Sequence, residues 1–445
     1  MKRHLYRKLT EWRSSRDRKP LLLYGARQTG KTYLLTEFGQ NEFSSLHYIN
    51  FEQDPEAIKL FEGKLSPETI IPLIELYLNS RIHPESDLVF FDEIQECPRA
   101  VTSLKYFHEE MPQLSVCCAG SYIGLLGNSE SFPVGKVQTL TLYPMSFSEF
   151  LHALRPSLFD YYTSFIESPE PLPGYVHEQL WNTLLIYYFT GGMPEAVAAL
   201  MESPLRTLSA EASDKISSIH SDLLTGYRSD FAKHSGILNA NHIHRVFEQV
   251  PIQLSRDVDG NAQRFTFKDV LPRSKRYRDL AGAIDWLKAT GLIYSSHIID
   301  SPEIPFGAHS RESIFKLYLF DIGLLHHMLG IPAASIMNMT YGSYKGYIAE
   351  NYTAAQLVTS GIRELYTWKG NTSEIEFIVL LNEHVVPVEV KSGLHTRRAK
   401  SLQVFRERYN PACAVKLSAR NFSREGSLLH VPLYAACDLH RLMIS

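Results

Sequence analysis

The sequence predicts an α/β protein in which a parallel sheet comes first along the chain. Between residues 20 and 150, short apolar runs alternate with segments of helical periodicity, as expected when helices cover both faces of a parallel sheet. A glycine-rich loop separates the first apolar run from the helix that follows it. A second series of helices and strands follows residue 311, so the chain of 445 residues is expected to contain several domains.

The first region contains five predicted strands. Their apolar runs are continuous rather than alternating, which is typical of strands buried on both faces. They span residues 20–24, 46–51, 87–92, 114–119 and 137–142. Residues 1–20 are basic and are expected to form a helix that leads into this core with a solvated basic face. From residue 151 to about 235 the pattern is helical, and we expect it to form a lid.

The stretch from 236 to 300 contains three short helical patterns and ends in an apolar strand. Its last helix, over residues 278–289, is followed by Gly291 and an apolar run, an order that suits a winged-helix unit. Basic residues precede and begin this helix, and they could face DNA phosphates. They are Arg273, Lys275, Arg276 and Arg278. A solvated charged face or a contact between domains is the alternative, and winged helices also serve as protein-binding modules.

The last part of the chain is predicted to be a separate α/β unit. Helices are expected over 321–330 and 343–358, and strands are expected over 364–368, 375–381, 385–391, 412–417 and 428–431. The sequence thus suggests four domains: a sheet core over 1–160, a helical lid over 161–235, a winged-helix-like unit over 236–310 and an α/β unit over 311–445.

Composition is that of an ordinary globular protein, with 44% hydrophobic and 21% charged residues and a net charge of −3. Such a charge argues against a nucleic-acid-binding surface that covers the whole protein, so any such surface must be local. The five cysteines have no metal-binding spacing and suggest reduced thiols in a cytoplasmic protein. No apolar stretch reaches the length of a membrane helix, so no membrane partner is expected.

The glycine-rich loop matches the pattern GxxxxGK(S/T) between a predicted strand and a predicted helix. Its residues are Gly25, Ala26, Arg27, Gln28, Thr29, Gly30, Lys31 and Thr32. Backbone N–H groups of such a loop can surround phosphate oxygens, and the helix N-terminus adds partial positive charge. Lys31 can reach the β- and γ-phosphates of ATP, and Thr32 can offer its hydroxyl to Mg²⁺. A glycine-rich turn that matches by chance is the alternative.

The third predicted strand ends in two carboxylates, Asp92 and Glu93. Asp92 would hold Mg²⁺, and Glu93 would polarise the water that attacks the γ-phosphate. Without the upstream loop, a solvated strand end would be the better interpretation. Ser121 follows the next strand and could sense the γ-phosphate, although Gly-Ser after a strand is also ordinary turn chemistry.

A second group of charged residues lies in the C-terminal unit. Glu376 is on one predicted strand, and Glu389 and Lys391 are on the next, where residues two apart share a face. Glu350 lies on a predicted helix upstream and could add a third carboxylate. Carboxylates with a lysine can hold Mg²⁺ or Mn²⁺ and activate water, with Glu376 and Glu389 as the candidate metal ligands. A cross-strand salt bridge is the alternative interpretation.

Six motifs resemble those of a known family. They occur in order at residues 25–32, 92–95, 143–150, 191–195, 315–325 and 388–391. From about residue 5 to 435, the chain resembles the prokaryotic AAA-type ATPases that carry a C-terminal domain of unknown function. That domain is similar to the PD-(D/E)xK restriction-endonuclease fold.

The resemblance implies a P-loop AAA+ core with a helical lid, a winged-helix domain and a restriction-endonuclease-like α/β domain. It implies ATP and Mg²⁺ at the loop, Asp92 and Glu93, and it puts the four charged residues of the C-terminal unit at the positions of a nuclease metal site. The sequence departs from the family pattern twice. Lys136 replaces an arginine, which removes a bidentate donor, and Glu376 replaces an aspartate, which changes the reach toward a metal.

The leading hypothesis is therefore an ATPase coupled to a nuclease-like domain that acts on or binds DNA or RNA. The alternative is a nucleotide switch whose nuclease-like domain is catalytically inactive and binds only DNA or a protein. A homo-oligomer is also plausible, because AAA-type sites often use a neighbour's arginine.

Overall fold

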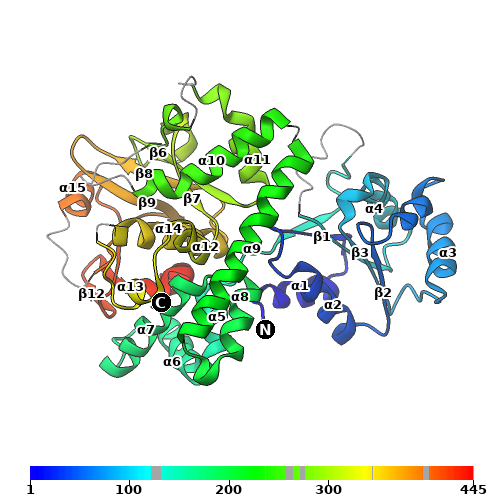
Figure 1. Ribbon diagram of the computed structural model, residues 1–445, viewed down its shortest axis with the longest axis horizontal. Coiled ribbons are helices and arrows are strands. Elements are labelled where there is room, and N and C mark those ends of the chain that lie inside the picture. The colour runs from blue at the N-terminus through cyan, green and yellow to red at the C-terminus, as the bar shows by residue number, and fades with distance from the viewer. Residues whose placement is uncertain are drawn as a thin grey trace. The chain divides into compact units, whose positions relative to one another are not determined.

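The computed structural model describes residues 1–121, 132–235, 237–255, 264–270, 276–342, 344–393 and 400–443. These residues form two compact units, whose elements are shown in Figure 1. The first unit comprises Met1–Tyr143 with Ala289–Gly291, and the second comprises Pro144–Lys288 and Leu292–Ser445. The finer division into four domains stays a prediction.

The first unit contains a five-stranded parallel sheet with the order β2-β3-β4-β1-β5. All five predicted strands of this region are confirmed within one residue at each end. They are β1 (Leu21–Tyr24), β2 (Leu46–Asn50), β3 (Leu88–Asp92), β4 (Ser115–Ala119) and β5 (Gln138–Thr141). Because β1, β4 and β3 run in parallel, the loop after β1 and the carboxylates at the end of β3 are held at the same edge of the sheet.

Helices cover both faces of this sheet (Figure 1). On one face α1 (Leu5–Ser14) and α2 (Lys31–Glu42) pack through Leu9, Trp12 and Phe38. On the other face α3 (Pro67–Leu78) and α4 (Pro98–Glu110) form a second core with Phe91. Alternate residues of the buried strands enter the two cores, which explains their continuous apolar runs.

The second unit begins with a run of helices, as the sequence predicts for 151–235. These are α5 (Phe147–Leu154), α6 (Pro156–Glu167), α7 (Gly174–Thr190), α8 (Pro194–Glu202) and α9 (Ala210–Ser235). Ser146 begins α5 with a capping box, because its hydroxyl accepts from the Glu149 N–H while the Glu149 carboxylate accepts from the Ser146 N–H. Helix α10 (Ile237–Ser255) follows α9 and packs against it.

An eight-stranded sheet forms the rest of the second unit, with the order β12-β13-β11-β10-β9-β8-β6-β7. Its strands are β6 (Ile293–Ile299), β7 (Ser310–Leu319), β8 (Leu365–Lys369), β9 (Glu374–Leu381), β10 (His384–Val390), β11 (Ala414–Ser418), β12 (Ser423–Glu425) and β13 (Leu428–Pro432). The five strands predicted after residue 360 are confirmed, whereas β7 and β12 were not predicted.

The strand pair expected of a winged helix has a different setting. Helix α11 (Ala281–Ala289) is indeed followed by the antiparallel pair β6 and β7. However, β6 also pairs in parallel with β8, so the pair belongs to the same sheet as the C-terminal strands. The winged-helix unit therefore stays a prediction.

The described part of the second unit also contains the helices α12 (Ile322–Met328), α13 (Ala333–Met337), α14 (Tyr344–Thr359), α15 (Lys400–Tyr409) and α16 (Leu439–Leu442). Helix α14 contacts β7 and β10, and α15 contacts β9 and β10. Among the helices of the described ranges, none has the length and apolar character needed to cross a membrane.

Candidate functional site

The loop between β1 and α2 adopts a conformation that requires glycine at two positions. Gly25 has a φ of 152°, and a Cβ atom there would lie 2.2 Å from the carbonyl oxygen of Leu142. Gly30 has a φ of 91° and precedes α2 as its N-cap. This conformation places the free N–H groups of the α2 N-terminus at the end of the loop, where they can bind an anion.

The side chain of Lys31 is folded onto its own loop. Its Nζ donates hydrogen bonds to the carbonyl oxygens of Gly25 at 3.0 Å and Ala26 at 2.9 Å, and the residue is buried. Burial lowers the pKa of Lys31 to about 8, although Glu93 and Asp92 act in the opposite direction. A phosphate ligand would have to take over the hydrogen bonds that the two carbonyl oxygens now accept.

Thr32 and Asp92 meet although they come from different elements. The Thr32 hydroxyl, in the first turn of α2, donates to Oδ2 of Asp92, at the end of β3, over 2.8 Å. Tyr48 donates to the same oxygen at 3.0 Å. Burial raises the pKa of Asp92, and the bonds from Thr32 and Tyr48 oppose that rise. A hydroxyl and a carboxylate oxygen side by side are hard donors, so they fit a Mg²⁺ ion.

Glu93 lies directly after this strand in a left-handed conformation, with φ 47° and ψ 47°. Its Oε2 accepts hydrogen bonds from the amide of Gln95 at 2.5 Å and from the hydroxyl of Ser121 at 3.4 Å. Ser121 reaches this carboxylate because β4, which precedes it, is the neighbour of β3. The structure thus brings together the predicted residues from three separate segments.

Two other loop residues, Thr29 and Arg27, contact protein groups close to them. The Thr29 hydroxyl donates to the carbonyl of Ala26 at 2.9 Å, which closes the loop internally. Arg27 lies 3.7 Å from Glu52. Lys136, where the family pattern has arginine, forms an ion pair of 3.0 Å with Glu109 of α4.

Arg3 was missed as a site residue, and the expectation of a solvated basic face was wrong for it. Its guanidinium is buried and donates to the carbonyl of Thr29 at 2.9 Å and to that of Tyr143 at 2.5 Å. The phosphate-binding loop is therefore anchored by a residue that precedes it by more than twenty positions. A basic residue near the N-terminus carries no signal of such a long-range bond.

In the second unit, the predicted Glu350 takes part in a buried ion-pair network. Lys316, on β7, lies 2.7 Å from Oε1 of Glu350 and 2.6 Å from Oε1 of Glu374. The hydroxyl of Tyr318 donates to the same oxygen of Glu350. Burial alone would lower the pKa of Lys316, but the two carboxylates outweigh it and hold this pKa above its usual value.

The other predicted residues form a second bridge. Nζ of Lys391 lies 3.2 Å from Oε1 of Glu376 and 3.2 Å from Oε1 of Glu389. The Val390 N–H donates to the other oxygen of Glu376 at 3.1 Å. Burial raises the pKa of Glu376 to about 7; Lys391 opposes this rise, and Glu389 adds to it.

The carboxylates of this network do not surround one common point. In the parts of the chain that the structure describes, no three His, Cys, Asp or Glu side chains are grouped so that they could hold a metal ion. One oxygen each of Glu374 and Glu389 is buried without a hydrogen-bond partner. As arranged here, the residues do not fit the second metal that the sequence suggested at Glu376 and Glu389, because lysines join the carboxylates in pairs.

Three family models match successive parts of the chain. An AAA domain model matches residues 17–151. Residues 17–151 are therefore similar to AAA domains, and we call this segment the AAA domain. Two domains of unknown function, DUF8612 and DUF4143, match residues 182–335 and 345–435. The AAA domain covers the loop, Asp92, Glu93 and Ser121, so all residues of the candidate nucleotide site except Arg3 lie inside it.

Solved structures give weaker matches. The ORC1 protein of Aeropyrum pernix in complex with DNA matches with 15% identity and a TM-score of 0.29, over 75% of this chain and 94% of that one. DnaA from Aquifex aeolicus, bound to AMPPCP, matches with 12% identity and a TM-score of 0.28, over 64% and 87%. TM-scores this low carry no weight for fold or function. No curated protein matches the sequence.

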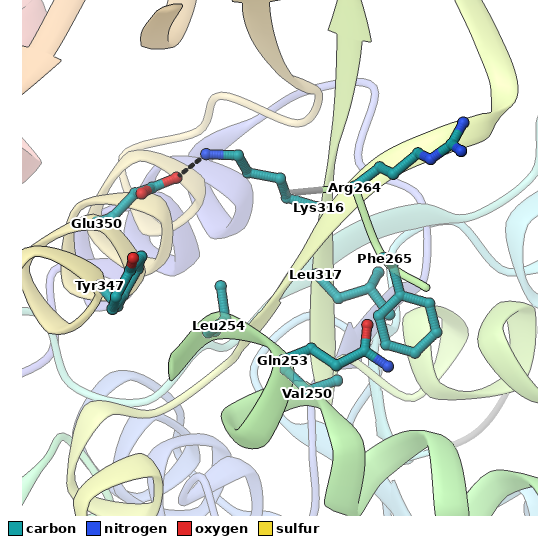
Figure 2. A pocket seen from close by; sticks show the side chains of 9 residues that line it. All are labelled: Val250, Gln253, Leu254, Arg264, Phe265, Lys316, Leu317, Tyr347 and Glu350. Carbon is teal, nitrogen blue, oxygen red and sulfur yellow. Dashed lines mark hydrogen bonds and ion pairs between the residues drawn. The ribbon is translucent and has the colours of Figure 1, made fainter. Parts of the chain in front are cut away.

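Outside the AAA domain, one pocket opens beside Lys316 and Glu350 (Figure 2). Its other walls come from the end of α10, from the segment between α10 and α11, from β7 and from α14. The residues are Val250, Gln253, Leu254, Arg264, Phe265, Leu317 and Tyr347. A second pocket shares Arg264 and adds Arg311, Lys369 and His309. Arg273 and Lys275 of the predicted basic cluster lie outside the described residues.

The sequence indicates only weakly that Lys316, Tyr318 and Glu374, which were not predicted, belong to the network. Lys316 and Tyr318 alternate with apolar residues in β7, and a charge inside such a strand requires a partner. Glu374 shares a face with Glu376, two residues on. Neither pattern says that the two would meet, because 58 residues separate Lys316 from Glu374.

Proposed function

We propose that this protein is an ATPase whose AAA domain binds and hydrolyses ATP with Mg²⁺. The observation that carries the proposal is the hydrogen bond between Thr32 and Asp92, next to Glu93. It joins the end of the phosphate-binding loop to the acidic end of β3, as a nucleotide site with a cation requires.

Each residue has a role in this proposal. Residues 25–30 and the start of α2 offer backbone N–H groups to the phosphates, and Lys31 leaves its two loop carbonyls to contact the β- and γ-phosphates. Thr32 and Asp92 would hold the cation, which neutralises charge on the phosphates when bound. Glu93 orients the attacking water and takes up its proton, and the bonds from Gln95 and Ser121 fix the position of its carboxylate.

The test is steady-state ATP turnover of the full chain with and without Lys31→Ala. We expect turnover to fall to background in the variant, since Lys31 supplies the ammonium group that contacts the β- and γ-phosphates in this proposal. Lys64→Ala, at an exposed lysine of the same unit, is the matched control and should keep wild-type turnover. Equal turnover in Lys31→Ala and wild type would refute the ATPase proposal.

We further propose that the second unit binds nucleic acid. The support is the pocket lined by Arg264, Arg311 and Lys369, which has three cations against the single carboxylate of Asp300. Arginine suits phosphate because its planar fork matches two oxygens. Binding of a labelled DNA or RNA strand should weaken in Arg311→Glu and should stay unchanged in Arg408→Glu, an exposed arginine of α15 outside both pockets.

Our second candidate function is a nucleotide switch. The ion pairs of the second unit support it over a metal-dependent nuclease. The carboxylates of the second unit are joined by lysines, and no group of three is free to hold a metal among the residues described. In this alternative the second unit binds its partner without cutting it. Cleavage of DNA or RNA with Mg²⁺ or Mn²⁺ that disappears in Lys391→Ala would restore the nuclease.

Two coarser properties complete the proposal. We place the protein in the cytoplasm, because all five cysteines are free and suit a reducing compartment.

We also propose that the AAA domain works in a homo-oligomer, in which a neighbouring copy supplies an arginine to the γ-phosphate. Light scattering with ATP under non-hydrolysing conditions tests this, and a monomer at all concentrations would contradict it.

A further inference from the structure

Four carboxylates and two lysines form the network of the second unit, and each lysine bridges two glutamates. Lys316 bridges Glu350 and Glu374, and Lys391 bridges Glu376 and Glu389. The bridge at Lys316 is the more enclosed one: 8% of its side chain is exposed, compared with 35% for Lys391. Because burying an unpaired charge is costly, the ammonium of Lys316 and its two carboxylates depend on one another.

Lys316 reaches Glu374 across the sheet because its neighbours are small. It pairs with Ser296 on β6, and Ser296 shares a 2.8 Å hydrogen bond with Thr367 on β8. The Thr367 hydroxyl also contacts the backbone carbonyl of Glu376 on β9. These short polar side chains leave room above β6 and β8, so the lysine of the edge strand can extend to the carboxylate on β9.

The ammonium occupies the kind of position that a cation would take. Its Nζ lies 2.6 and 2.7 Å from oxygens of two carboxylates, at the short end for charged hydrogen bonds. A Mg²⁺ or Mn²⁺ ion between the same oxygens would have to displace this positive charge. Tyr318 donates to the Glu350 oxygen that Lys316 also contacts, so this oxygen already has two donors.

We propose that Lys316 takes the place of a divalent cation between Glu350 and Glu374 and thereby keeps metal ions out of this network. Burial does not exclude the ion, since the pocket in Figure 2 is lined by Lys316 and Glu350 and opens to their ion pair. The charge of Lys316 excludes it. Exclusion of the ion by Lys316 involves the second unit alone and does not depend on ATP hydrolysis by the AAA domain.

The test is Mn²⁺ binding to the full chain without nucleotide, measured by electron paramagnetic resonance of free Mn²⁺ and by the shift in unfolding temperature. The wild type should bind no ion in the second unit. Lys316→Met leaves two carboxylates without their cation, so it should unfold at a lower temperature and should bind Mn²⁺ at least about tenfold more tightly than wild type. Added Mn²⁺ should then raise its unfolding temperature.

Two further variants locate the ion and control for the loss of a lysine. Lys316→Met combined with Glu374→Gln should lose the gained Mn²⁺ site. Lys215→Met removes a lysine that pairs with Glu202 at 2.7 Å on the surface of the same unit, and it should gain no site. Any ion held at Thr32 and Asp92 would be the same in all four proteins and cancels in the comparison.

Two results would overturn the proposal. One is a Mn²⁺ site in the wild type that Glu374→Gln or Glu376→Gln removes. This result can be obtained even if no lysine variant folds. The other is a folded Lys316→Met, or the hydrogen-bonding variant Lys316→Gln, that binds Mn²⁺ no better than wild type. A loss of ATP turnover in Lys31→Ala is independent of both results, so the two proposals can fail separately.

Discussion

The hydroxyl of Thr32 donates to Oδ2 of Asp92 over 2.8 Å, although 60 residues separate them in the chain. The first residue opens α2 after the phosphate-binding loop, and the second ends β3. Their contact follows from the strand order, in which β4 separates β1 from β3 while all three run in parallel. The carboxyl ends of these strands therefore share one edge, where open α/β sheets bind ligands.

Glu93→Gln should separate ATP binding from ATP hydrolysis. The amide keeps the size and the hydrogen bonds of the carboxylate but cannot take up a proton from water, so we expect kcat to fall by roughly 10²-fold or more while ATP affinity stays within about threefold. Phosphate release and binding of a fluorescent ATP analogue measure the two effects. Glu96→Gln, three residues further on, is the control; an equal loss of kcat there would remove the special role of Glu93.

The affinity for ATP should depend on pH through Lys31. Burial lowers the pKa of Lys31 to about 8 in the free protein, and a bound triphosphate would raise it again. Below about pH 8 the free lysine is charged and affinity should be constant. Above that pH, protons must be taken up on binding, and affinity should fall by up to about tenfold for each further pH unit.

Calorimetry in two buffers of different ionisation enthalpy checks this directly. Proton uptake on ATP binding should be near zero at pH 6.5 and should rise toward one proton per site near pH 9. Lys31→Arg is the control, because its guanidinium stays charged throughout this range. The same rise of proton uptake with pH in this variant would assign the effect to another group.

Arg3→Ala should weaken ATP binding from outside the loop. The guanidinium of Arg3 holds the carbonyls of Thr29 and Tyr143, and its loss leaves two buried acceptors without this donor. We expect a loss of about 1–3 kcal/mol in stability of the AAA domain and a weaker affinity for ATP at unchanged pH dependence. Arg7→Ala, at an exposed arginine that pairs with Glu11 in the same helix, should change neither, as measured by thermal unfolding and ATP titration.

Sequence reasoning could find the elements and the local motifs but not the long-range partners. The strands of the first unit have continuous apolar runs, and Gly25–Thr32 has a fixed spacing, so both could be predicted from neighbouring residues. Arg3 and Lys316 could not, because each meets carbonyl or carboxylate groups that lie tens of residues away. The edge strand β7 was missed for a related reason, since its first half, from Ser310, is polar and exposed and only Phe315–Leu319 is apolar.

The predicted metal site depends on more than the spacing of its carboxylates. Glu376, Glu389 and Lys391 do converge, as their positions on adjacent strands suggest. The sequence did not show that Lys316 would enter the same network and that each lysine would join two carboxylates. A cluster of carboxylates predicts a metal ion only when no basic side chain already compensates its negative charge. Which basic side chains do so depends on the folded chain.

The second unit should lose stability as pH rises from about 4.5 to about 7, and Glu376 should cause part of this loss. Its pKa is about 7 in the folded chain compared with 4.5 in an unfolded one, chiefly because of burial. The folded state therefore holds this proton more tightly than the unfolded state does. The resulting stabilisation is fully present below about pH 4.5 and disappears as pH rises to about 7, with a size on the order of 3 kcal/mol.

Glu376→Gln tests this prediction, because the neutral amide imitates the protonated acid at every pH. Between pH 5 and pH 8, hydrogen exchange of β9 and β10 should speed up more in wild type than in the variant. At pH 8 the variant should be the more stable protein. Glu383→Gln, in the turn between the same two strands and exposed to solvent, is the matched control. If wild type and Glu376→Gln keep a constant difference in exchange across this range, Glu376 does not titrate there and its charge is held by Lys391 alone.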